Sequence, residues 1–435
     1  MSASRTVELQ GHIIDSGTMQ RCFGIVMDHG GTFEVEEFDI GRRETDESYC
    51  RMRVEADSEE HLQNILHQLH QNGAHLPDAG DATLEAAPAD RVVPNEFYST
   101  TNHPTEVRVD GAWYAVENIE MDCAIVVERD SDGGATRAYT KVLNAIREGD
   151  LVVTGEAGIR VRPPDRPRDS SGPFGFMRGG VSAERPSEAL VEEVAAALEE
   201  TVESGGNILV VAGPAVSHTG AGDDLARLVR GGYVDMLSAG NGFAVHDIEQ
   251  DIYGTSLGMN VETLEHPRKG HKHHIYTISE VIRAGGIAEA VEAGLINEGV
   301  MYECVTNDVD YVLAGSIRDD GPLPDTITDS IEAQNAIREQ AHRADVVVML
   351  STLLHSVAVG NCLPSTTKVV CVDINPATVT QLLDRGSSQA IGMVTDVGAF
   401  VPMLADKLLG PEPDDEEFEM DGIEPEDGER ERDWE

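Results

Sequence analysis

From about residue 186 onward, short apolar runs rich in β-branched residues alternate with helical stretches, and this alternation constrains the fold more than any other feature. Six such runs are "NILVVAG" (207–213), "YVDMLSA" (233–239), "VDYVLAGS" (309–316), "DVVVML" (345–350), "KVVCVDI" (368–374) and "AIGMVT" (390–395). Runs that are apolar throughout are typical of parallel strands covered on both faces. With their intervening helices they predict an α/β fold, a Rossmann-like doubly wound parallel sheet over residues 186–410.

The first part of the chain, residues 1–92, shows a different pattern. "RTVELQGHII" (5–14), "GIVMDHGGTFEVEEFDI" (24–40) and "SYCRMRVEAD" (48–57) read as strands with partly alternating polarity. "SEEHLQNILHQLHQNG" (58–73) predicts a helix with Ser58 as its cap and Gly73 as its stop. Strands flanking a helix over this length predict a ferredoxin-like α+β unit.

Residues 93–185 predict a β-rich middle region. "AWYAVENIE" (112–120), "DCAIVVERD" (122–130) and "DLVVTGEAGIRVRPP" (150–164) are strand-like, whereas "TRAYTKVLNAIREGD" (136–150) favours one helix.

Two segments are poor in apolar residues. "PPDRPRDSSGPFGFMRGG" (163–180) is rich in Pro, Gly and Arg. It is either an interdomain linker or a mobile loop that closes over a ligand, and Phe174, Phe176 and Arg178 are unusual in a pure spacer. Residues 411–435 consist mostly of charged and turn-forming residues, which predicts a disordered acidic tail.

The chain is strongly acidic. It has 79 Asp and Glu against 32 Lys and Arg, a net charge of −47, while 40% of its residues are hydrophobic. We interpret this surplus as adaptation to high salt, where screening weakens self-repulsion, and it argues against nucleic-acid binding. No apolar segment resembles a signal peptide or a membrane span, and none of the six cysteines forms a C-x-x-C pair. We therefore expect a soluble cytoplasmic protein with reduced thiols and without a structural zinc site.

Ligands of open parallel sheets bind at the carboxyl ends of the strands, so the residues there are candidates for a binding site. The glycine fingerprint G-x-G-x-x-G is incomplete in both "GAGDDL" and "GNGFAV". Asp373 ends one strand, where an acid can accept both hydroxyls of an adenosine ribose, although a simple turn acid is the alternative. The next helix has a better cap in Asn375, before Pro376. Asp396 ends the last strand, and helix capping explains it equally well.

Two further stretches carry polar side chains suited to chemistry. In "AGNGFAVHDIEQD" (239–251), Asp247 and Asp251 share one helix face and Glu249 lies on a neighbouring face. This is either an active site or a helix start with a solvated acidic face. In "KGHKHHIYTISE" (269–280), adjacent histidines on one element point apart, so we predict no metal site. Proton transfer or anion binding by Lys272, His273 and His274 and a plain surface turn remain open.

Four motifs carry a resemblance to a known family: "AGNGFAVHDIEQDIYGTSLG", "GHKHHIYT", "VVMLSTLLHSVAVGN" and "VDINPATVTQLLDRGS". Over residues 5–405 the chain resembles the archaeal ornithine cyclodeaminases and the C-terminal part of related cyanobacterial arginine-degrading enzymes. Its first hundred residues resemble the lysine-ketoglutarate reductase/saccharopine dehydrogenase conserved region, and its C-terminal part is similar to deoxyhypusine synthase. The resemblance implies that NAD lies across the carboxyl ends of the late strands. The cofactor-binding residues that it implies are Asn241, Gly242, Thr352, Leu353, Leu354, His355, Asp373, Ile374, Asp396 and Val397.

The resemblance also implies a reaction, the conversion of L-ornithine to L-proline and ammonia, in which NAD takes the Cα hydride and returns it. Because two amines must lose protons, we expect His246 or Glu249 to transfer protons and Asp247 to bind an amine. Lys272 would hold the substrate carboxylate, and the 170–180 loop would close the site. The expected partners are this small-molecule substrate and further copies of the chain, as a dimer or tetramer, in ornithine metabolism and proline biosynthesis.

Three other functions remain open from the sequence. A net NAD-dependent amino-acid dehydrogenase would accumulate NADH, and a deoxyhypusine-synthase-like transferase would need an acceptor lysine on a partner protein. An amino-acid sensor built on the ferredoxin-like unit would bind its ligand without turnover and would need no acidic cluster beside the sheet.

Overall fold

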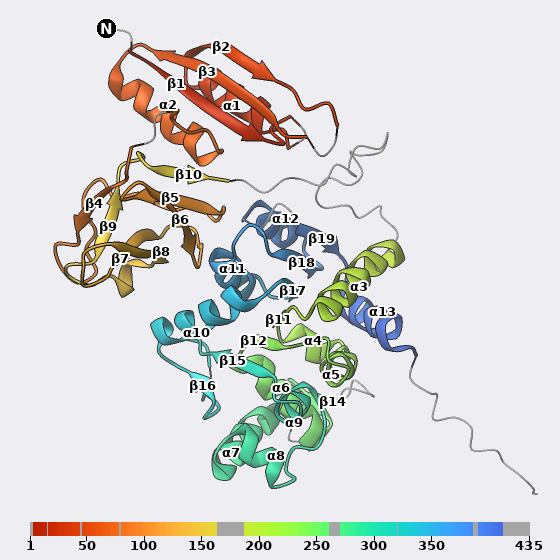
Figure 1. Cartoon of the computed structure of the whole chain (residues 1–435). Coiled ribbons are helices and arrows are strands. Elements are labelled where there is room, and N and C mark those ends of the chain that lie inside the picture. Colours follow the sequence, from red (N-terminus) through yellow and green to blue (C-terminus); the bar gives the residue numbers. More distant parts are fainter. Residues whose placement is uncertain are drawn as a thin grey trace, which may run out of the picture.

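The computed structural model arranges the chain as an N-terminal α+β unit, a curled second sheet and a larger α/β unit, which follow one another along an elongated molecule (Figure 1). The structure describes residues 3–14, 16–43, 46–77, 80–162, 187–260, 270–319, 321–385 and 390–411. The expected loop over 163–180 and all but the first residue of the expected acidic tail lie outside these described residues.

The α/β unit is built on a seven-stranded sheet in which every pair of neighbouring strands is parallel. Its order is β16-β15-β12-β11-β17-β18-β19. The strands are β11 (Ile208–Ala212), β12 (Met236–Gly240), β15 (Asp310–Ala314), β16 (Thr326–Ile327), β17 (Val346–Leu350), β18 (Lys368–Asp373) and β19 (Ala390–Val394). The six apolar runs are thus confirmed as parallel strands. The edge strand β16 has only two residues and leaves no periodic signal in the sequence.

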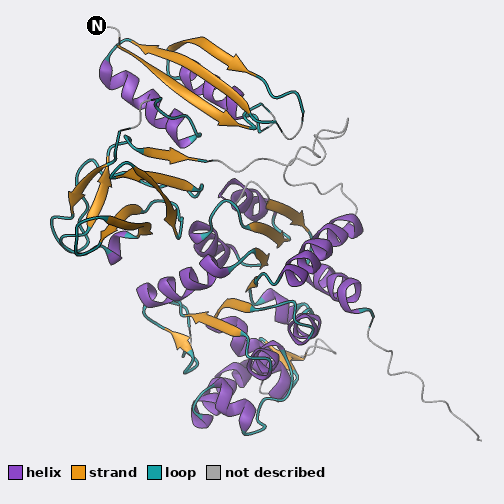
Figure 2. Cartoon of the chain, in the orientation of Figure 1, coloured by secondary structure: helices purple, strands orange, loops and turns teal. Residues whose placement is uncertain are grey.

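Helices cover both faces of this sheet, which confirms the doubly wound fold (Figure 2). Alternate residues of β11 pack into two separate cores: Ile208, Val210 and Ala212 into one, Leu209 and Val211 into the other. The first core includes residues of α3 (Ser187–Ser204), α5 (Gly222–Arg230) and α13 (Val397–Leu409); the second includes residues of α10 (Ser330–Arg343), α11 (Leu353–Cys362) and α12 (Pro376–Arg385). This two-sided burial explains why the strands are apolar throughout.

The connections determine where the parallel sheet opens. From β11 the chain winds toward β12 and β15, and from β17 it winds the other way toward β18 and β19. The neighbouring strands β11 and β17 therefore form the topological switch point, where open α/β sheets bind ligands.

A long helical excursion separates β12 from β15. It contains α6 (Asn241–Tyr253), β13 (Thr255–Ser256), β14 (Met259–Asn260), the 3-10 turn Gly270–Lys272, α7 (His273–Ala284), α8 (Ile287–Glu292) and α9 (Val300–Thr306). The short helix α4 (Ala215–His218) follows β11 and lies against α6.

The N-terminal unit has the ferredoxin-like arrangement, with its last strand reduced to one bridge. Its elements are β1 (Ala3–Gly11), α1 (Thr18–Asp28), β2 (Thr32–Asp39), β3 (Ser48–Ala56) and α2 (Glu59–Gln71). The strands form an antiparallel sheet of order β1-β3-β2, and a bridge from Glu8 to His75 continues the sheet beyond β1. Ser58 caps α2 as predicted, because its hydroxyl accepts a hydrogen bond from the His61 backbone N–H.

One strand prediction in this unit is wrong. Residues 24–40 were read as strand-forming, but the first of them belong to helix α1 and only Thr32–Asp39 form β2. The helix begins at Thr18, and its buried residues Met19, Cys22 and Val26 follow a helical spacing. The turn glycines Gly30 and Gly31 then separate the two elements.

The second sheet has the order β10-β5-β6-β8-β7-β9-β4. Its strands are β4 (Thr83–Ala86), β5 (Thr105–Val109), β6 (Ala112–Glu117), β7 (Ala124–Arg129), β8 (Ala135–Lys141), β9 (Leu151–Thr154) and β10 (Ile159–Val161). The predicted helix over 136–150 is wrong: β8 occupies its first half because it pairs with both β6 and β7, and only a 3-10 turn, Leu143–Ala145, follows. Since β4 pairs with β9, this sheet begins before the expected boundary at residue 92.

A buried ion pair joins the second sheet to the α/β unit. Arg338 on α10 donates from Nε and Nη2 to the two carboxylate oxygens of Glu120, at 2.6 and 3.0 Å, and both side chains are largely buried. Burial alone would raise the pKa of Glu120, but the nearby His342 ring, 3.7 Å away, and the hydrogen bonds from Arg338 lower it below its usual value. Ser365 N–H also donates to the Asn102 carbonyl at 2.8 Å across the same junction.

We expect Glu120→Gln to lower the free energy of unfolding by about 3 kcal/mol, because it leaves the Arg338 guanidinium buried without its counter-charge. Differential scanning calorimetry measures this as a lower melting temperature. The matched control is Glu200→Gln, since Glu200 pairs with Lys368 on the exposed surface and such pairs contribute little. Equal melting temperatures for the two variants would contradict a structural role for the buried pair.

Candidate active site

The loops after β11 and β17 touch at the topological switch point. A Cβ atom on Gly213 would lie 2.2 Å from the Ser351 carbonyl oxygen, so only glycine allows this approach. Ser351 itself has a φ of 49°, in the left-handed region. The backbone segments around Gly213 and Ser351 are thus in contact at the carboxyl edge of the sheet.

The loop after β12 joins the same edge. A Cβ atom on Gly242 would lie 3.9 Å from Pro214 in the β11 loop, and one on Gly240 would lie 3.4 Å from the His355 ring on α11. Asn241 accepts hydrogen bonds at its Oδ1 from the Leu323 backbone N–H and the Thr326 hydroxyl, which ties α6 to β16 and to the loop before it. The structure thus brings the first residues of α6 beside the β11 and β17 loops.

Residues 352–355 form the start of α11, directly after β17. Thr352 is the N-cap position, and the side chains of Leu353 and Leu354 are exposed, Leu354 at 78%. Burial lowers the pKa of His355, against the effect of a hydrogen bond with the Ala239 backbone. Exposed apolar side chains beside free helix N–H groups suit the apolar and phosphate parts of a dinucleotide.

Asp373 is the last residue of β18, and its Oδ1 accepts a hydrogen bond from the Asn375 backbone N–H at 2.7 Å. Asn375 in turn accepts from the Ala377 N–H, so it caps α12 as predicted. The adjacent Ile374 is 71% exposed at the carboxyl edge.

Asp396 and Val397 lie at the start of α13. Asp396 accepts a hydrogen bond from the Gly398 N–H and is the helix cap, while Val397 is buried in the core. A Cβ atom on Gly398 would lie 2.9 Å from the Thr219 side chain, so this helix start packs against the end of α4.

A buried carboxylate on α6 is the centre of a polar network. Glu249 is 0% exposed and its Oε2 lies 2.8 Å from the His246 Nδ1. Its Oε1 accepts hydrogen bonds from the Thr255 hydroxyl at 2.8 Å and the Gly258 N–H at 2.9 Å. Burial acts to raise the pKa of Glu249, but the bonds from His246, Thr255 and Gly258 lower it below its usual value. Glu249 is therefore a carboxylate inside the protein.

The network extends to a second histidine on α7. The Thr255 hydroxyl gives its proton to Glu249, so His273 Nδ1–H donates to the Thr255 oxygen at 2.8 Å. The ring of Tyr253 stacks on His273 with centroids 4.7 Å apart. The resulting chain of contacts runs from His273 through Thr255 and Glu249 to His246.

A third histidine lies on the other side of His246. His218, at the end of α4, has its ring 4.9 Å from the His246 ring, and its Nδ1 lies 2.6 Å from the Ser256 hydroxyl. Burial, followed by the nearness of His246, lowers the pKa of His218 to about 4. This imidazole is therefore neutral at neutral pH, so it adds no positive charge to the cluster.

The two remaining acids of α6 hold the helical excursion together. Asp247 is buried and accepts hydrogen bonds from the backbone N–H groups of Val300 and Met301, at 3.0 and 2.8 Å, which caps α9. Burial raises the pKa of Asp247 to about 7, against the effect of these two bonds. Asp251 accepts from the Asn297 N–H at 2.7 Å. Because Asp247 is buried and both of its oxygens contact the α9 backbone, the structure favours a capping role over the predicted amine-binding role, which stays a prediction.

Lys272 is exposed at the end of the 3-10 turn before α7, next in the chain to His273. In the part of the chain that the structure describes, no group of three or more His, Cys, Asp or Glu is arranged to hold a metal ion. No helix among these residues is long and apolar enough to cross a membrane. All six cysteines are buried and unpaired.

Sequence reasoning did not assign His218, Thr255 or Ser256 to the site. His218 had a usable signal, since "VVAGPAVSHTGAG" directly follows the first strand of the parallel sheet. Thr255 and Ser256 had none, because hydroxyl residues after a helix are common in turns. Only the fold of β13 back onto α6 brings them to Glu249 and His218.

Three family models match consecutive parts of the chain. Residues 4–103 match the LOR/SDH bifunctional enzyme conserved region, and residues 104–191 match the first region of the arginine dihydrolase ArgZ-like C-terminal part. Residues 192–404 match the Rossmann fold of the same ArgZ-like C-terminal part.

Two solved structures, one of ArgZ and one of AgrE, each align with 94% of this chain. The apo structure of ArgZ, an arginine dihydrolase from the ornithine-ammonia cycle in cyanobacteria, is 41% identical with a TM-score of 0.80. A ternary complex of AgrE with ornithine and NAD+ is 44% identical with a TM-score of 0.51. The present chain spans only 58% and 57% of those two longer chains.

Archaeal relatives match over almost their full length. The protein named ornithine cyclodeaminase from Methanopyrus kandleri is 52% identical over 92% of this chain and 96% of its own. The one from Methanothermobacter thermautotrophicus is 51% identical over 93% of this chain and 98% of its own. With about half of its residues identical over this length, the chain belongs to the archaeal ornithine cyclodeaminase family.

Proposed function

We propose that this protein is an NAD-dependent ornithine cyclodeaminase that converts L-ornithine to L-proline and ammonia. The observation that carries the proposal is the buried Glu249–His246 pair on α6, a helix that starts where β12 ends beside the switch point. The names of the archaeal relatives and the ornithine and NAD+ bound to AgrE support this choice of substrate and cofactor.

The carboxyl edge of the sheet has the features that NAD requires. Gly213 lets two loops approach closely, and the start of α11 presents backbone N–H groups to a pyrophosphate. Ile374 and Leu354 offer exposed apolar surface for the adenine, and Asp373 would accept hydrogen bonds from the adenosine ribose. Asn241 and Gly242 at the start of α6 lie near His355 of α11, and these three residues would line the nicotinamide half. NAD supplies the acceptor for the C2 hydride of ornithine and the donor that returns it.

His246 is the proposed general base. With Nδ1–H donated to the Glu249 carboxylate, its Nε2 carries the lone pair that can take a proton from a substrate ammonium group. The negative charge of Glu249 stabilises the imidazolium that results, and it also fixes the ring orientation. Glu249 is therefore a positioning residue, and His246 is the residue that meets the substrate.

The surroundings of this pair suit a diamine substrate. The neutral His218 beside His246 avoids repulsion of the second ammonium group. The Thr255 hydroxyl and His273 continue the hydrogen-bond chain from Glu249. Their hydrogen bonds would strengthen or weaken with the charge of the Glu249–His246 pair as His246 gains and loses a proton. Lys272, one residue before His273, remains our proposal for binding the substrate carboxylate. For Asp247 we propose a structural role as the cap of α9.

We also propose that the enzyme works in the cytoplasm at high salt, as a homo-oligomer that supplies proline. The net charge of −47 supports the high-salt setting, because molar salt screens the self-repulsion of such a surface. On α7, the exposed side chains of Ile275, Tyr276 and Ile282 offer apolar surface for contact with another copy.

The first prediction concerns the central carboxylate. Glu249→Gln should lower kcat by about 100-fold, because it removes the charge that stabilises protonated His246. Binding of NAD, measured by calorimetry in molar salt, should stay within about twofold, since Glu249 does not belong to the cofactor edge.

The matched control is Asp247→Asn, two residues away on the same helix. It should lower the melting temperature through the weakened cap of α9 while the kcat of the folded enzyme changes little. The folded state of the parent chain holds a proton on Asp247 up to about pH 7, so this residue makes the protein less stable as pH rises from about 4 to 7. Asp247→Asn should remove this decrease of the free energy of unfolding between about pH 4 and pH 7. Full activity of Glu249→Gln would refute the proposed pair.

The second prediction concerns cofactor choice. A carboxylate at Asp373 repels the 2′-phosphate of NADP, so the enzyme should bind NAD more tightly than NADP. Asp373→Ser should weaken NAD binding about tenfold and bring the affinities for NAD and NADP closer together, as measured by calorimetry. The control is Asp329→Ser, since Asp329 caps α10 after the edge strand β16 and should not affect either nucleotide. Equal affinities of the parent enzyme for the two nucleotides would contradict this placement.

The third prediction separates cyclodeamination from net oxidation. L-Ornithine deuterated at C2 should yield L-proline deuterated at C2, because a returned hydride does not exchange with water. The amount of ammonia formed should equal the amount of proline formed, and the absorbance of NADH should not increase with turnover. Loss of the label to solvent would indicate elimination, and NADH formed in step with product would indicate an amino-acid dehydrogenase.

A further inference from the structure

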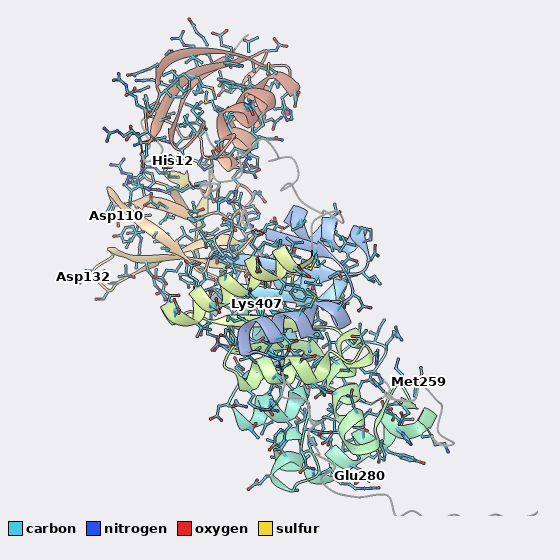
Figure 3. All side chains as sticks on the ribbon, turned by 90° about the vertical axis from the view of Figure 1, so that its right-hand side faces the viewer. His12, Asp110, Asp132, Met259, Glu280 and Lys407 are labelled. Carbon is cyan, nitrogen blue, oxygen red and sulfur yellow. The ribbon has the colours of Figure 1, made fainter. Side chains whose placement is uncertain are left out.

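A cavity of about 310 Å³ lies where the N-terminal unit meets β10 of the second sheet. The N-terminal unit contributes Gln10, His12, Glu47 and Asn72 to its walls, and β10 with the next residue contributes Arg160 and Arg162. Figure 3 labels His12 at this junction, away from the α/β unit. The cavity is therefore separate from the proposed active site, and a ligand could occupy it whether or not the proposed reaction takes place there.

One wall carries an excess of positive charge. Arg162 donates to the Glu106 carboxylate at 2.8 Å, and Arg160 lies 3.7 Å from the same oxygen. Two guanidinium groups thus share one carboxylate, in a chain where acids outnumber bases by 79 to 32. The Arg160 guanidinium stacks 4.4 Å from the Trp113 ring, and its buried Nε has no hydrogen-bond partner. This stacking holds Arg160 in place for a further anionic partner.

The opposite charge comes from the N-terminal unit. Glu47, just before β3, accepts a hydrogen bond from the Gln10 amide at 2.9 Å and has an exposed side chain. The amide of Gln10, the side chain of Asn72 and the ring of His12 add polar groups between the two charged walls. A ligand in this cavity would meet guanidinium groups from one unit and a carboxylate from the other.

We propose that this cavity is a second binding site, for a free α-amino acid. The α-carboxylate would pair with Arg160 and Arg162, for which the planar guanidinium is well suited, and the α-ammonium would pair with Glu47. A volume of about 310 Å³ is at the lower end of small-molecule pockets and accommodates an amino acid. The ligand would bridge two units of the chain, so it would stabilise their relative arrangement.

The test measures binding to the full-length chain without NAD. L-Proline, L-ornithine, L-arginine and L-glutamate are screened by thermal shift, and the amino acid with the largest shift is titrated by calorimetry. Arg162→Gln and Glu47→Gln should each weaken this binding at least tenfold. Arg160→Lys keeps the charge but not the planar fork, so it should weaken binding less than Arg162→Gln.

Matched controls are available on the same two units. Arg137→Gln removes a guanidinium that also pairs with a carboxylate and lies over an aromatic ring, and Glu36→Gln removes the carboxylate partner of Arg53. Both should bind the amino acid as the parent chain does. The N-acetyl and methyl ester derivatives of the amino acid should each bind at least tenfold more weakly, because each lacks one of the two charges.

Three outcomes would overturn the proposal. The first is that none of the four amino acids stabilises the chain. The second is that the cavity variants bind the amino acid as tightly as the parent chain does, because binding would then take place outside this cavity, for example at the active site. Equal binding of the N-acetyl derivative would mean a simple anion site rather than an amino-acid site.

Discussion

The pairing of β11 with β17 is the constraint on which the rest of the α/β unit depends. These two parallel strands are in register from Ile208–Val346 to Ala212–Leu350, and the chain leaves them in opposite winding directions. The loops that follow them meet at Gly213 and Ser351 and then lead to helices on opposite faces of the sheet. Because no side chain fits at Gly213, backbone atoms are in contact at this point of the carboxyl edge. A small residue at such a point lets the pyrophosphate of a dinucleotide approach the backbone.

The groups proposed to be catalytic are held by a different feature, a buried carboxylate whose hydrogen bonds, among the described residues, come from nearby parts of the chain. Glu249 receives bonds from His246 in its own helix and from Thr255 and Gly258 in the turn that follows. An uncompensated carboxylate would be very costly in this position, so the hairpin β13–β14 must fold onto α6 for the site to form. Asp247 and Asp251 then fasten α9 and the residues before it to the same helix. Helix α6 thus carries both the Glu249–His246 pair, which we propose to be catalytic, and the two acids that fasten the neighbouring elements to it.

The three units are coupled through polar junctions rather than one continuous core. Each has its own apolar clusters, and the Glu120–Arg338 pair and the Ser365–Asn102 bond join the second sheet to the α/β unit. The cavity with Glu47 on one wall and Arg160 on the other lies at the other junction. Because the Glu120–Arg338 pair is largely buried, salt screens it less than a pair on the surface, and it ties the second sheet to the α/β unit.

The sequence alone determined the elements that repeat a strong local pattern. The six apolar strands, the cap Ser58 and the cap Asn375 were predictable because burial on both faces and capping chemistry act within a few residues. The motifs around His246, Asp373 and residues 352–355 also led us to expect a site at the carboxyl edge of the sheet, and this assignment stays a prediction. Helix α1 and strand β8 were missed, since tertiary pairing and packing outweighed local preference there. Only the tertiary structure separated Glu249 from Asp247: both are acids on α6, but Glu249 faces His246 and Thr255, whereas Asp247 faces the backbone of α9. Side-chain partners far apart in the sequence decide what a buried carboxylate does, and no local pattern encodes them.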